Sequence, residues 1–341
     1  MSLKLGLMTG YWGAEPPANI IGTAQQAEKL GYWGFFTAEA YGSDALTPLA
    51  WVGAHTSTIK LGTAIVQISA RTPTATAMHA LTLDHLSQGR MILGLGVSGP
   101  QVVEGWYGQP FAKPLSRTRE YISIIRQVLE RQQPVVGPGP HYTLPYPADA
   151  PGSWGLGKPL KPITHPLRAN LPIFLGAEGP KNVTMAAETC DGWYPLYYSP
   201  WRQEVYAENI ASRPEGFEIL YPMKLHITDD LEAGRLEVKK NLALYIGGMG
   251  AKDRNFHNEL IVRMGYADAA RKIQDLFLDG KKREAVAAVP DELVDEIALV
   301  GPKDRIRQQL AAWDDSPVTG LMVWPKAEGD LETFAELLLD R

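Results

Sequence analysis

Three glycines and a serine lie at the end of one apolar run of the chain, in the segment ILGLGVSGPQ (residues 92–101). Gly94, Gly96 and Gly99 have the G-x-G-x-x-G spacing of a dinucleotide-binding turn, which follows a strand and is completed by an acid about 20 positions on. Gly94 falls inside the expected strand, and no second strand ends where that acid should stand. Two other interpretations stay open. The glycines allow close packing at the strand end, or Ser98 and Gly99 offer a hydroxyl and backbone N–H groups to a ligand.

A second glycine-bearing segment, LGAEGPKN (residues 175–182), precedes an expected helix. Its proline, Pro180, is well suited to the first position of that helix. A helix N-terminus presents unpaired N–H groups and the positive end of the helix dipole, which favours a phosphate. Glu178 would have to point away from such an anion. The segment therefore predicts a phosphate seat built from backbone groups.

Few side chains in the chain are suited to acid–base chemistry at a strand end. Glu39 closes the segment FFTAE, where a carboxylate could bind a cofactor, move a proton or form a structural ion pair. Tyr41 follows two positions later and is a second candidate for proton transfer. The single cysteine, Cys190, excludes an intrachain disulfide and a cysteine-rich metal site, so we predict no metal and a reducing, cytoplasmic location.

Short apolar runs alternate with longer amphipathic ones along most of the chain, which predicts repeated β–α units. The expected strands cover residues 3–9, 33–39, 60–67, 90–97, 171–177, 191–197, 217–228 and 319–325. Eight such units in 341 residues predict a single-domain (β/α)8 TIM barrel, with a doubly wound open sheet as the alternative.

Two insertions interrupt the alternation of strands and helices, after strands 4 and 7. The first, at about 134–171, is rich in Pro, Gly and aromatic residues, and is expected to be an ordered insertion or a lid. The second, at about 229–296, is expected to be helical from residue 231 to residue 293.

Active sites of such barrels lie at the carboxyl ends of the strands. In this chain those positions are rich in aromatic and small residues and poor in His and Cys, which suits a flat organic cofactor better than a metal. The net charge of −5 and the absence of any Lys/Arg block argue against nucleic acid and anionic membrane surfaces as partners. No apolar run approaches the roughly 20 residues of a membrane span. The expected partner is a small-molecule substrate.

Three long segments, in this order and spacing, carry a family resemblance. They are FFTAEAYGSDALTPLAWVGAHTSTIKLGTAIV, TPTATAMHALTLDHLSQGRMILGLGVSGPQVVEGWYG and PIFLGAEGPKNVTMAAETCDGW. Together they resemble the luciferase-like flavin and deazaflavin oxidoreductases, and most closely the subgroup that uses coenzyme F420. The resemblance implies a barrel that forms a homodimer and holds its cofactor across the strand ends, with the phosphate tail toward the loops after strands four and five.

Particular residues follow from the resemblance alone. Family members carry a non-prolyl cis peptide behind the cofactor ring, and the matching pair here is Ala64 and Ile65. By position, Gln67 would contact the ring edge, and Glu39 is a further cofactor-binding candidate. The tail would lie against Ser98, Gly99 and Pro100, and its phosphate against Gly176, Ala177, Glu178 and Gly179.

The chain also departs from the family pattern. Members that oxidise sugar phosphates have a histidine after the acid of strand two, where this chain has Ala40. Their acid after strand four corresponds to Gln101, a candidate catalytic position that cannot donate a proton as a carboxylic acid does. A sugar-phosphate substrate is therefore not expected.

The leading hypothesis is a coenzyme F420-dependent oxidoreductase that transfers hydride between the deazaflavin and a small carbonyl, imine or activated alkene. An FMN-dependent luciferase-like monooxygenase and a non-catalytic flavin- or deazaflavin-binding protein are the alternatives. Aromatic side chains are expected to wall the substrate pocket. They are Tyr11, Trp12, Trp106 and Tyr107, with Tyr197 and Tyr198 opposite.

Overall fold

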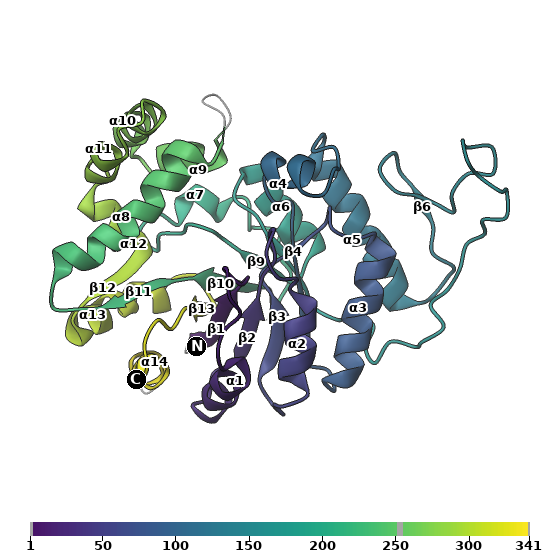
Figure 1. Cartoon of the computed structure of the whole chain (residues 1–341), viewed down its shortest axis with the longest axis horizontal. Helices are drawn as coiled ribbons and strands as arrows, with labels where there is room; N and C mark the ends of the chain where they lie inside the picture. Colours follow the sequence, from purple (N-terminus) through teal and green to yellow (C-terminus); the bar gives the residue numbers. More distant parts are fainter. Residues whose placement is uncertain (1–2, 251–254, 340–341) are drawn as a thin grey trace.

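Eight parallel strands form a closed ring in the computed structural model of the chain, which describes residues 3–250 and 255–339 (Figure 1). Around the ring these are β1 (Lys4–Gly10), β2 (Gly34–Thr37), β3 (Lys60–Thr63), β5 (Met91–Gly96), β8 (Ile173–Gly176), β9 (Gly192–Tyr194), β10 (Glu218–Pro222) and β13 (Gly320–Val323). Pairing of β3 with β5 and of β1 with β13 closes the ring. The prediction of a (β/α)8 barrel is confirmed, and the open-sheet alternative is wrong.

One buried side chain from each of seven strands fills the inside of the barrel. They are Met8, Phe36, Ile92, Phe174, Tyr194, Leu220 and Met322. The eighth strand, β3, has Gly62 at this level and contributes no side chain. The ring of Phe36 fills the space, and a Cβ on Gly62 would overlap it. The interior is therefore a packed core, and a ligand must sit above it, at the carboxyl ends of the strands.

Close packing explains the first two glycines of the 92–101 segment. Gly94 and Gly96 both lie within β5 rather than in a turn after it. A Cβ on Gly94 would overlap the carbonyl oxygen of Thr63, and a Cβ on Gly96 would lie 2.7 Å from Cγ1 of Ile65. The spacing that resembles a dinucleotide-binding turn is thus a packing requirement of the barrel wall.

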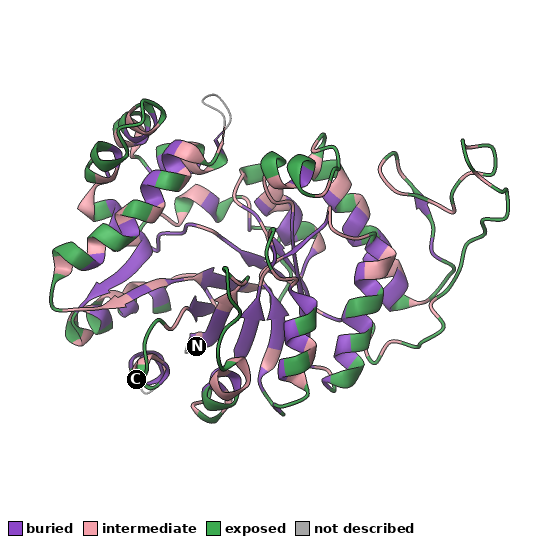
Figure 2. Ribbon diagram, in the orientation of Figure 1, coloured by how far each residue is buried: buried purple, intermediate pink, exposed green. Residues whose placement is uncertain are grey.

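Helices cover the outside of the ring, with their buried faces toward the strands (Figure 2). Between the strands these are α1 (Ile20–Lys29), α2 (Leu46–Gly53), α3 (Pro73–Leu86), α4 (Pro100–Gly105), α5 (Pro114–Glu130), α6 (Pro180–Thr189), α7 (Glu204–Ala207), α13 (Lys303–Asp314) and α14 (Asp330–Leu338). Local signals set their ends. In α3, for example, Pro73 stands in the first turn and Thr72 Oγ1 accepts a hydrogen bond from Ala75 N at 3.3 Å. None of the described helices is both long and apolar enough to cross a bilayer.

The expected seventh strand, 217–228, is two strands. β10 ends at Pro222, and the N–H of Met223 still bonds the carbonyl of Met322 in β13, at 2.8 Å. The chain then leaves the barrel as β11 (Lys224–Ile227), which pairs in parallel with β12 (Ala298–Gly301). The sequence analysis did not predict β12. The single-strand prediction fails because the second half of the apolar run has a partner outside the ring.

The second insertion is mostly helical over its described residues, as the sequence analysis expected, but it consists of several separate helices. Its described part contains α8 (Leu231–Gly248), α9 (Phe256–Arg263), α10 (Ala267–Leu278), α11 (Lys282–Ala287) and α12 (Asp291–Ile297). Gly265 and Gly280 separate successive helices with φ values of 91° and 80°, a left-handed conformation that favours glycine. Residues 251–254 of the predicted helix lie outside the described residues.

The first insertion has little regular structure. It contains a short antiparallel pair, β6 (Gly137–Pro138) and β7 (Thr143–Leu144). The segment 139–168, called the arm below, projects past α3 and α5, away from the strand ends (Figure 1). Where the arm returns to the barrel, Arg168 pairs with the buried carboxylate of Asp84 in α3, with Nη2 and Oδ1 2.7 Å apart.

Candidate cofactor site at the barrel mouth

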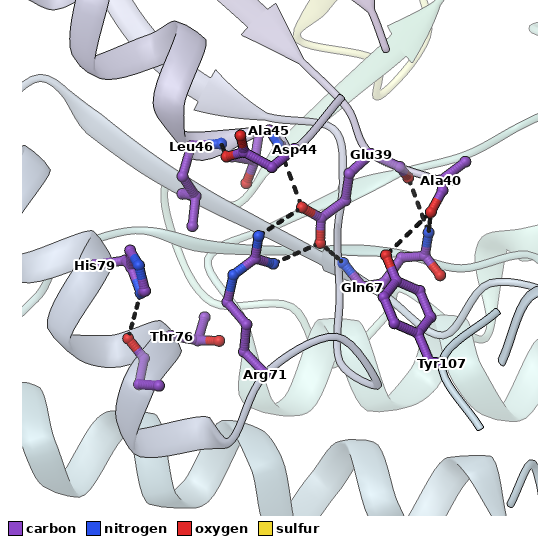
Figure 3. A network of polar contacts seen from close by, with 12 residues as sticks. Glu39, Ala40, Asp44, Ala45, Leu46, Gln67, Arg71, Thr76, His79 and Tyr107 are labelled. Atoms are coloured by element: carbon purple, nitrogen blue, oxygen red, sulfur yellow. Dashed lines mark hydrogen bonds and ion pairs between the residues drawn. The ribbon is translucent and has the colours of Figure 1, made fainter. Parts of the chain in front are cut away.

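A buried ion pair joins the ends of two neighbouring strands at the barrel mouth. Glu39 follows β2, and Arg71 follows the turn after β4 (Val66–Gln67), the short continuation of β3 (Figure 3). The guanidinium donates to both carboxylate oxygens, from Nη1 to Oε1 at 2.7 Å and from Nη2 to Oε2 at 3.0 Å. Gln67 N donates to Oε1 at 2.9 Å and Ala45 N to Oε2 at 3.2 Å, so each oxygen has two donors. Burial acts to lower the pKa of Arg71, but its hydrogen bonds to Glu39, together with the negative charges of Glu39 and Asp44, raise the pKa above its usual value.

Gln67 lies directly beside this pair and is almost entirely buried. Its Nε2 donates to the carbonyl oxygens of Glu39 and Ala40, both at 3.1 Å. The hydroxyl of Tyr107 donates to the same Ala40 carbonyl at 3.0 Å (Figure 3). Oε1 of Gln67 has no partner among the described residues. A buried carbonyl oxygen without a donor is costly unless a ligand supplies one.

A bulge between β3 and the short strand β4 (Val66–Gln67) carries these groups. The peptide bond between Ala64 and Ile65 is cis, as the family resemblance predicted. Ala64 N donates to Thr37 O at 2.7 Å, and Glu39 N donates to Ile65 O at 3.2 Å, which ties the bulge to the chain after β2. A Cβ on Gly176 would lie 3.3 Å from Cγ2 of Ile65, so the end of β8 also meets the bulge.

The two expected tail loops are neighbours, because β5 and β8 pair with Leu95 opposite Leu175. Ser98, with φ of 61°, adopts a left-handed conformation that costs energy for a residue with a side chain. Gly179 is the N-cap of α6, and no side chain caps this helix. A Cβ on Gly179 would meet nothing within 4 Å. The first turn of α6 therefore faces open space with N–H groups that no side chain occupies.

Glu178 turns its side chain away from the start of α6. Its Oε2 lies 2.6 Å from Nδ1 of His257 in α9. Its backbone carbonyl accepts hydrogen bonds from Nη2 of Arg263 at 3.2 Å and from the hydroxyl of Tyr206 at 3.1 Å. The second insertion thus contacts the expected phosphate loop. The sequence analysis did not identify His257 and Arg263, because their helical segment carries no local signal of a site.

The aromatic side chains expected at the mouth divide into two groups. Tyr41 and Trp106 are 62% and 63% exposed, and Tyr11 is also exposed. Nε1 of Trp12 is buried without a partner among the described residues. By contrast, Tyr198 is fully buried, stacked on Tyr206 and in contact with Trp313 of α13. The prediction that Tyr198 walls a substrate pocket is therefore wrong, because its ring belongs to the layer between barrel and helices.

Tyr197 is also buried, but it lies under the second insertion. Its hydroxyl donates to Oδ1 of Asn241 in α8 at 3.3 Å, and its ring packs edge-on against Tyr245. Gln101, in the first turn of α4, is exposed beside Gly99. The predicted catalytic and cofactor-binding residues lie at or after the ends of β2, β3, β5 and β8, which are consecutive around the ring.

These features fit a flat ring with an anionic tail. Gln67 offers a buried acceptor at the bulge. The start of α6 offers N–H groups that no side chain caps, next to Gly179, where a Cβ would meet nothing within 4 Å. The described residues contain no group of three or more His, Cys, Asp or Glu side chains placed to hold a metal ion.

Comparison with known proteins identifies the class. The family profile described as luciferase-like monooxygenase matches residues 4–320, so the chain belongs to that family. A relative from Mycobacterium tuberculosis, named "Putative coenzyme F420-dependent oxidoreductase", is 54% identical over 98% of this chain and 99% of its own length. A 5,10-methylenetetrahydromethanopterin reductase from Archaeoglobus fulgidus is 25% identical over 83% of this chain and 82% of its own length.

Solved structures share the fold at low sequence identity. The coenzyme F420 dependent tetrahydromethanopterin reductase from Methanopyrus kandleri has a TM-score of 0.76 at 22% identity, covering 99% of this chain and 97% of its own. An F420-dependent secondary alcohol dehydrogenase in complex with an F420-acetone adduct has a TM-score of 0.71 at 15% identity, covering 99% of this chain and 98% of its own.

Proposed function

We propose that this chain is a coenzyme F420-dependent oxidoreductase that acts on a small organic substrate. Identity of 54% over nearly the whole length to a relative named for this cofactor is the observation that carries the proposal. The buried acceptor at the bulge and the uncapped start of α6 support it, because the ring and the anionic tail of such a cofactor need those two kinds of group. Bound coenzyme F420 supplies hydride transfer at carbon five of its ring, to or from a carbonyl, imine or activated alkene.

The residues of the bulge would orient the ring. Ala64 and Ile65 would form the wall behind it, and Oε1 of Gln67 would accept a hydrogen bond from the ring edge. The hydrogen bonds of Nε2 to the chain after β2 fix Oε1 as the amide atom that has no partner among the described residues. Backbone groups would hold the tail and its phosphate. They belong to Ser98, Gly99 and Pro100 after β5, and to Gly176, Ala177, Glu178 and Gly179 after β8.

Glu39 would act through Gln67 rather than on the substrate. Its two oxygens already accept four hydrogen bonds, two of them from Arg71. A proton on Glu39 would have to displace one of these donors. We therefore assign Glu39 as a positioning residue that fixes the bulge. Tyr41 is exposed beside it and is the candidate for proton transfer, and Gln101 is a candidate for contact with the substrate.

Binding of each oxidised cofactor, followed by quenching of tryptophan fluorescence, tests the proposal. Coenzyme F420 should bind more tightly than FMN, and anaerobic mixing of the protein with reduced F420 and a panel of aldehydes, ketones and enones should oxidise the cofactor. Tighter binding of FMN, with oxygen consumption when reduced FMN is added, would establish a monooxygenase instead, as the description of the family profile suggests. Binding of F420 without turnover on any substrate would favour a non-catalytic binding protein.

We further propose that the protein is a cytoplasmic homodimer. The arm supports this assembly, because it exposes several large apolar side chains, with Trp154 and Ile163 90% and 96% exposed and Leu156 and Leu160 also exposed, and a surface rich in apolar groups favours an interface. The single cysteine, Cys190, is buried, as expected where disulfides do not form. Light scattering coupled to gel filtration should give twice the chain mass for the wild type and the single-chain mass for a Trp154→Ser, Ile163→Ser variant. A monomeric wild type would contradict the assembly.

A further inference from the structure

We infer that a cavity between β11, α8 and the segment after β13 binds the carboxylate of an apolar organic acid, and that this carboxylate anchors the substrate. The inference rests on the proposed function and names the substrate class for that site. It depends on four features of the cavity: its walls, its uncompensated positive charge, its position on the ring of strands and its connection to the mouth.

The cavity has a volume of about 400 Å³, which is enough for a small organic molecule. One wall is apolar and is formed by the indole of Trp324 with Pro325 and Leu225. The other carries charged and polar side chains, among them Lys224 and Lys326. A ligand that fills this space would have a hydrocarbon body and a charged end.

Positive charge exceeds negative charge in the lining of the cavity. Lys224 Nζ lies 4.1 Å from the centre of the Trp324 ring, and no carboxylate among the described residues pairs with it. The one acid in the lining, Glu237, is already bound to Lys240, with Oε1 and Nζ 2.6 Å apart. Lys326 adds a second cation. An anion that entered here would find two ammonium groups and no free acid to repel it.

The lowered pKa values of Lys224 and His226 agree with a site suited to an anion. Burial, and then the charge of Lys326, lower the pKa of Lys224. The same two causes, burial first, lower the pKa of His226 to about 4, so this imidazole is neutral at pH 7. A bound carboxylate would reverse the repulsion between the two ammonium groups and stabilise the charged form of Lys224.

The position of the cavity assigns it to the substrate rather than to the cofactor tail. Its walls come from β11, which follows β10 but pairs outside the ring, from α8 and from the segment after β13, whereas the expected tail loops follow β5 and β8. In the closed ring, β13 is four strands from β5, which is the opposite side of the mouth. Figure 1 shows β11 and α8 on the side of the barrel away from α5.

A side-chain contact connects the cavity with the mouth. Asn241 lines the cavity and accepts a hydrogen bond from Tyr197, which packs against Tyr245 and His257 beside the phosphate loop. Trp324 reaches the same mouth from the other side, since a Cβ on Gly10 at the end of β1 would lie 3.8 Å from its Nε1. An acid held by Lys224 can therefore extend its apolar end along Trp324 toward the strand ends.

Calorimetric titration of the full chain with phenylacetate, and with its uncharged analogue phenylacetamide, tests this inference. We expect phenylacetate to bind at least about tenfold more tightly than the amide, and Lys224→Met to weaken phenylacetate binding at least about tenfold. Lys224→Arg should keep most of the affinity, because it keeps the charge. Lys272→Met, at an exposed position of α10, is the matched control and should change nothing.

Three results would overturn the inference. The first is equal binding of phenylacetate and phenylacetamide, and the second is wild-type affinity in a folded Lys224→Met variant. The third is displacement of phenylacetate by inorganic phosphate at equal concentration, because the apolar wall would then contribute nothing to binding. The thermal midpoint of each variant reports whether it folds. If Lys224→Met does not fold, the Lys326→Gln variant replaces it, with weaker binding of phenylacetate expected and unchanged binding contradicting the inference. F420 binding to the wild type is measured separately, so a failure of the cofactor proposal is recognised independently of the result for this cavity.

Discussion

Arg71 binds both carboxylate oxygens of Glu39, and the peptide N–H of Gln67 shares one of them. This pair couples the chain after β2 to the bulge after β3. Because the bulge carries Gln67, whose buried Oε1 has no partner among the described residues, the ion pair holds in place an acceptor that a ring at the strand ends could use. Its contribution is therefore to geometry at the mouth as much as to stability.

Replacing Arg71 with methionine should destabilise the protein by about 3–5 kcal/mol, because it leaves the carboxylate of Glu39 buried without its cation. Urea unfolding of the wild type and the variant measures this. Adding Glu39→Gln to the Arg71→Met background should recover part of the loss, since the buried charge is then removed. No recovery in the double variant would contradict the assignment of Glu39 as the charge that Arg71 neutralises.

Gly94 should tolerate no side chain. Gly94→Ala would place a methyl group against the carbonyl of Thr63 and 2.5 Å from the ring of Tyr194, and we expect a loss of about 3 kcal/mol or more. Gly105→Ala is the control, because its Cβ would meet nothing within 4 Å and should change stability by no more than about 0.5 kcal/mol. Equal thermal midpoints for the two variants would show that β5 is not packed as described.

Substitution of Gly179 should weaken cofactor binding without changing stability. A Cβ there meets no protein atom within 4 Å, so Gly179→Ala should unfold at the wild-type temperature. If the tail approaches the start of α6 closely, the added methyl should weaken F420 binding about tenfold, as expected for crowding of roughly 1–3 kcal/mol. The same fluorescence titration on Gly105→Ala provides the control. Unchanged affinity in Gly179→Ala would place the tail elsewhere.

Protonation of His226 should lower the free energy of unfolding as the pH falls. Its folded-state pKa of about 4 is below the ordinary value of about 6.5, so between these pH values the unfolded chain takes up a proton that the folded chain does not. This contribution is fully present above about pH 6.5 and is lost as the pH falls toward 4. Allowing for solvent screening, the wild type should lose about 1 kcal/mol more than His226→Gln between pH 7.5 and 5.0.

Urea unfolding of both proteins at the two pH values measures this difference. The exposed His79→Gln variant is the control and should follow the wild type. Parallel losses in the wild type and in His226→Gln would show that this imidazole has the same proton affinity folded and unfolded.

The barrel could be predicted from the sequence because each of its units is local. A short apolar run followed by an amphipathic helix marks one β–α unit, and eight of them specify the ring. The glycines of the 92–101 segment show the limit of that approach. Their spacing is compatible with a nucleotide turn, and only the neighbouring Thr63 and Ile65 reveal that Gly94 and Gly96 are required for packing.

Pairings between distant segments could not be predicted. Nothing near Lys224 indicates that the strand leaves the barrel there, because its partner β12 lies more than seventy residues further on. Likewise, the sequence alone does not show whether Arg71 faces the mouth or solvent. Its ion pair with Glu39 depends on the bulge between them. The contact of His257 with Glu178 arises from how the second insertion folds back, which no local spacing encodes.

A crystal structure of the protein soaked with coenzyme F420 tests the proposed site most directly. We predict a ring against Ala64 and Ile65, with its edge hydrogen-bonded to Gln67 and its phosphate at the loop 176–179. An electron density map with the mouth empty at saturating F420, or with the phosphate bound away from the start of α6, would contradict the proposal.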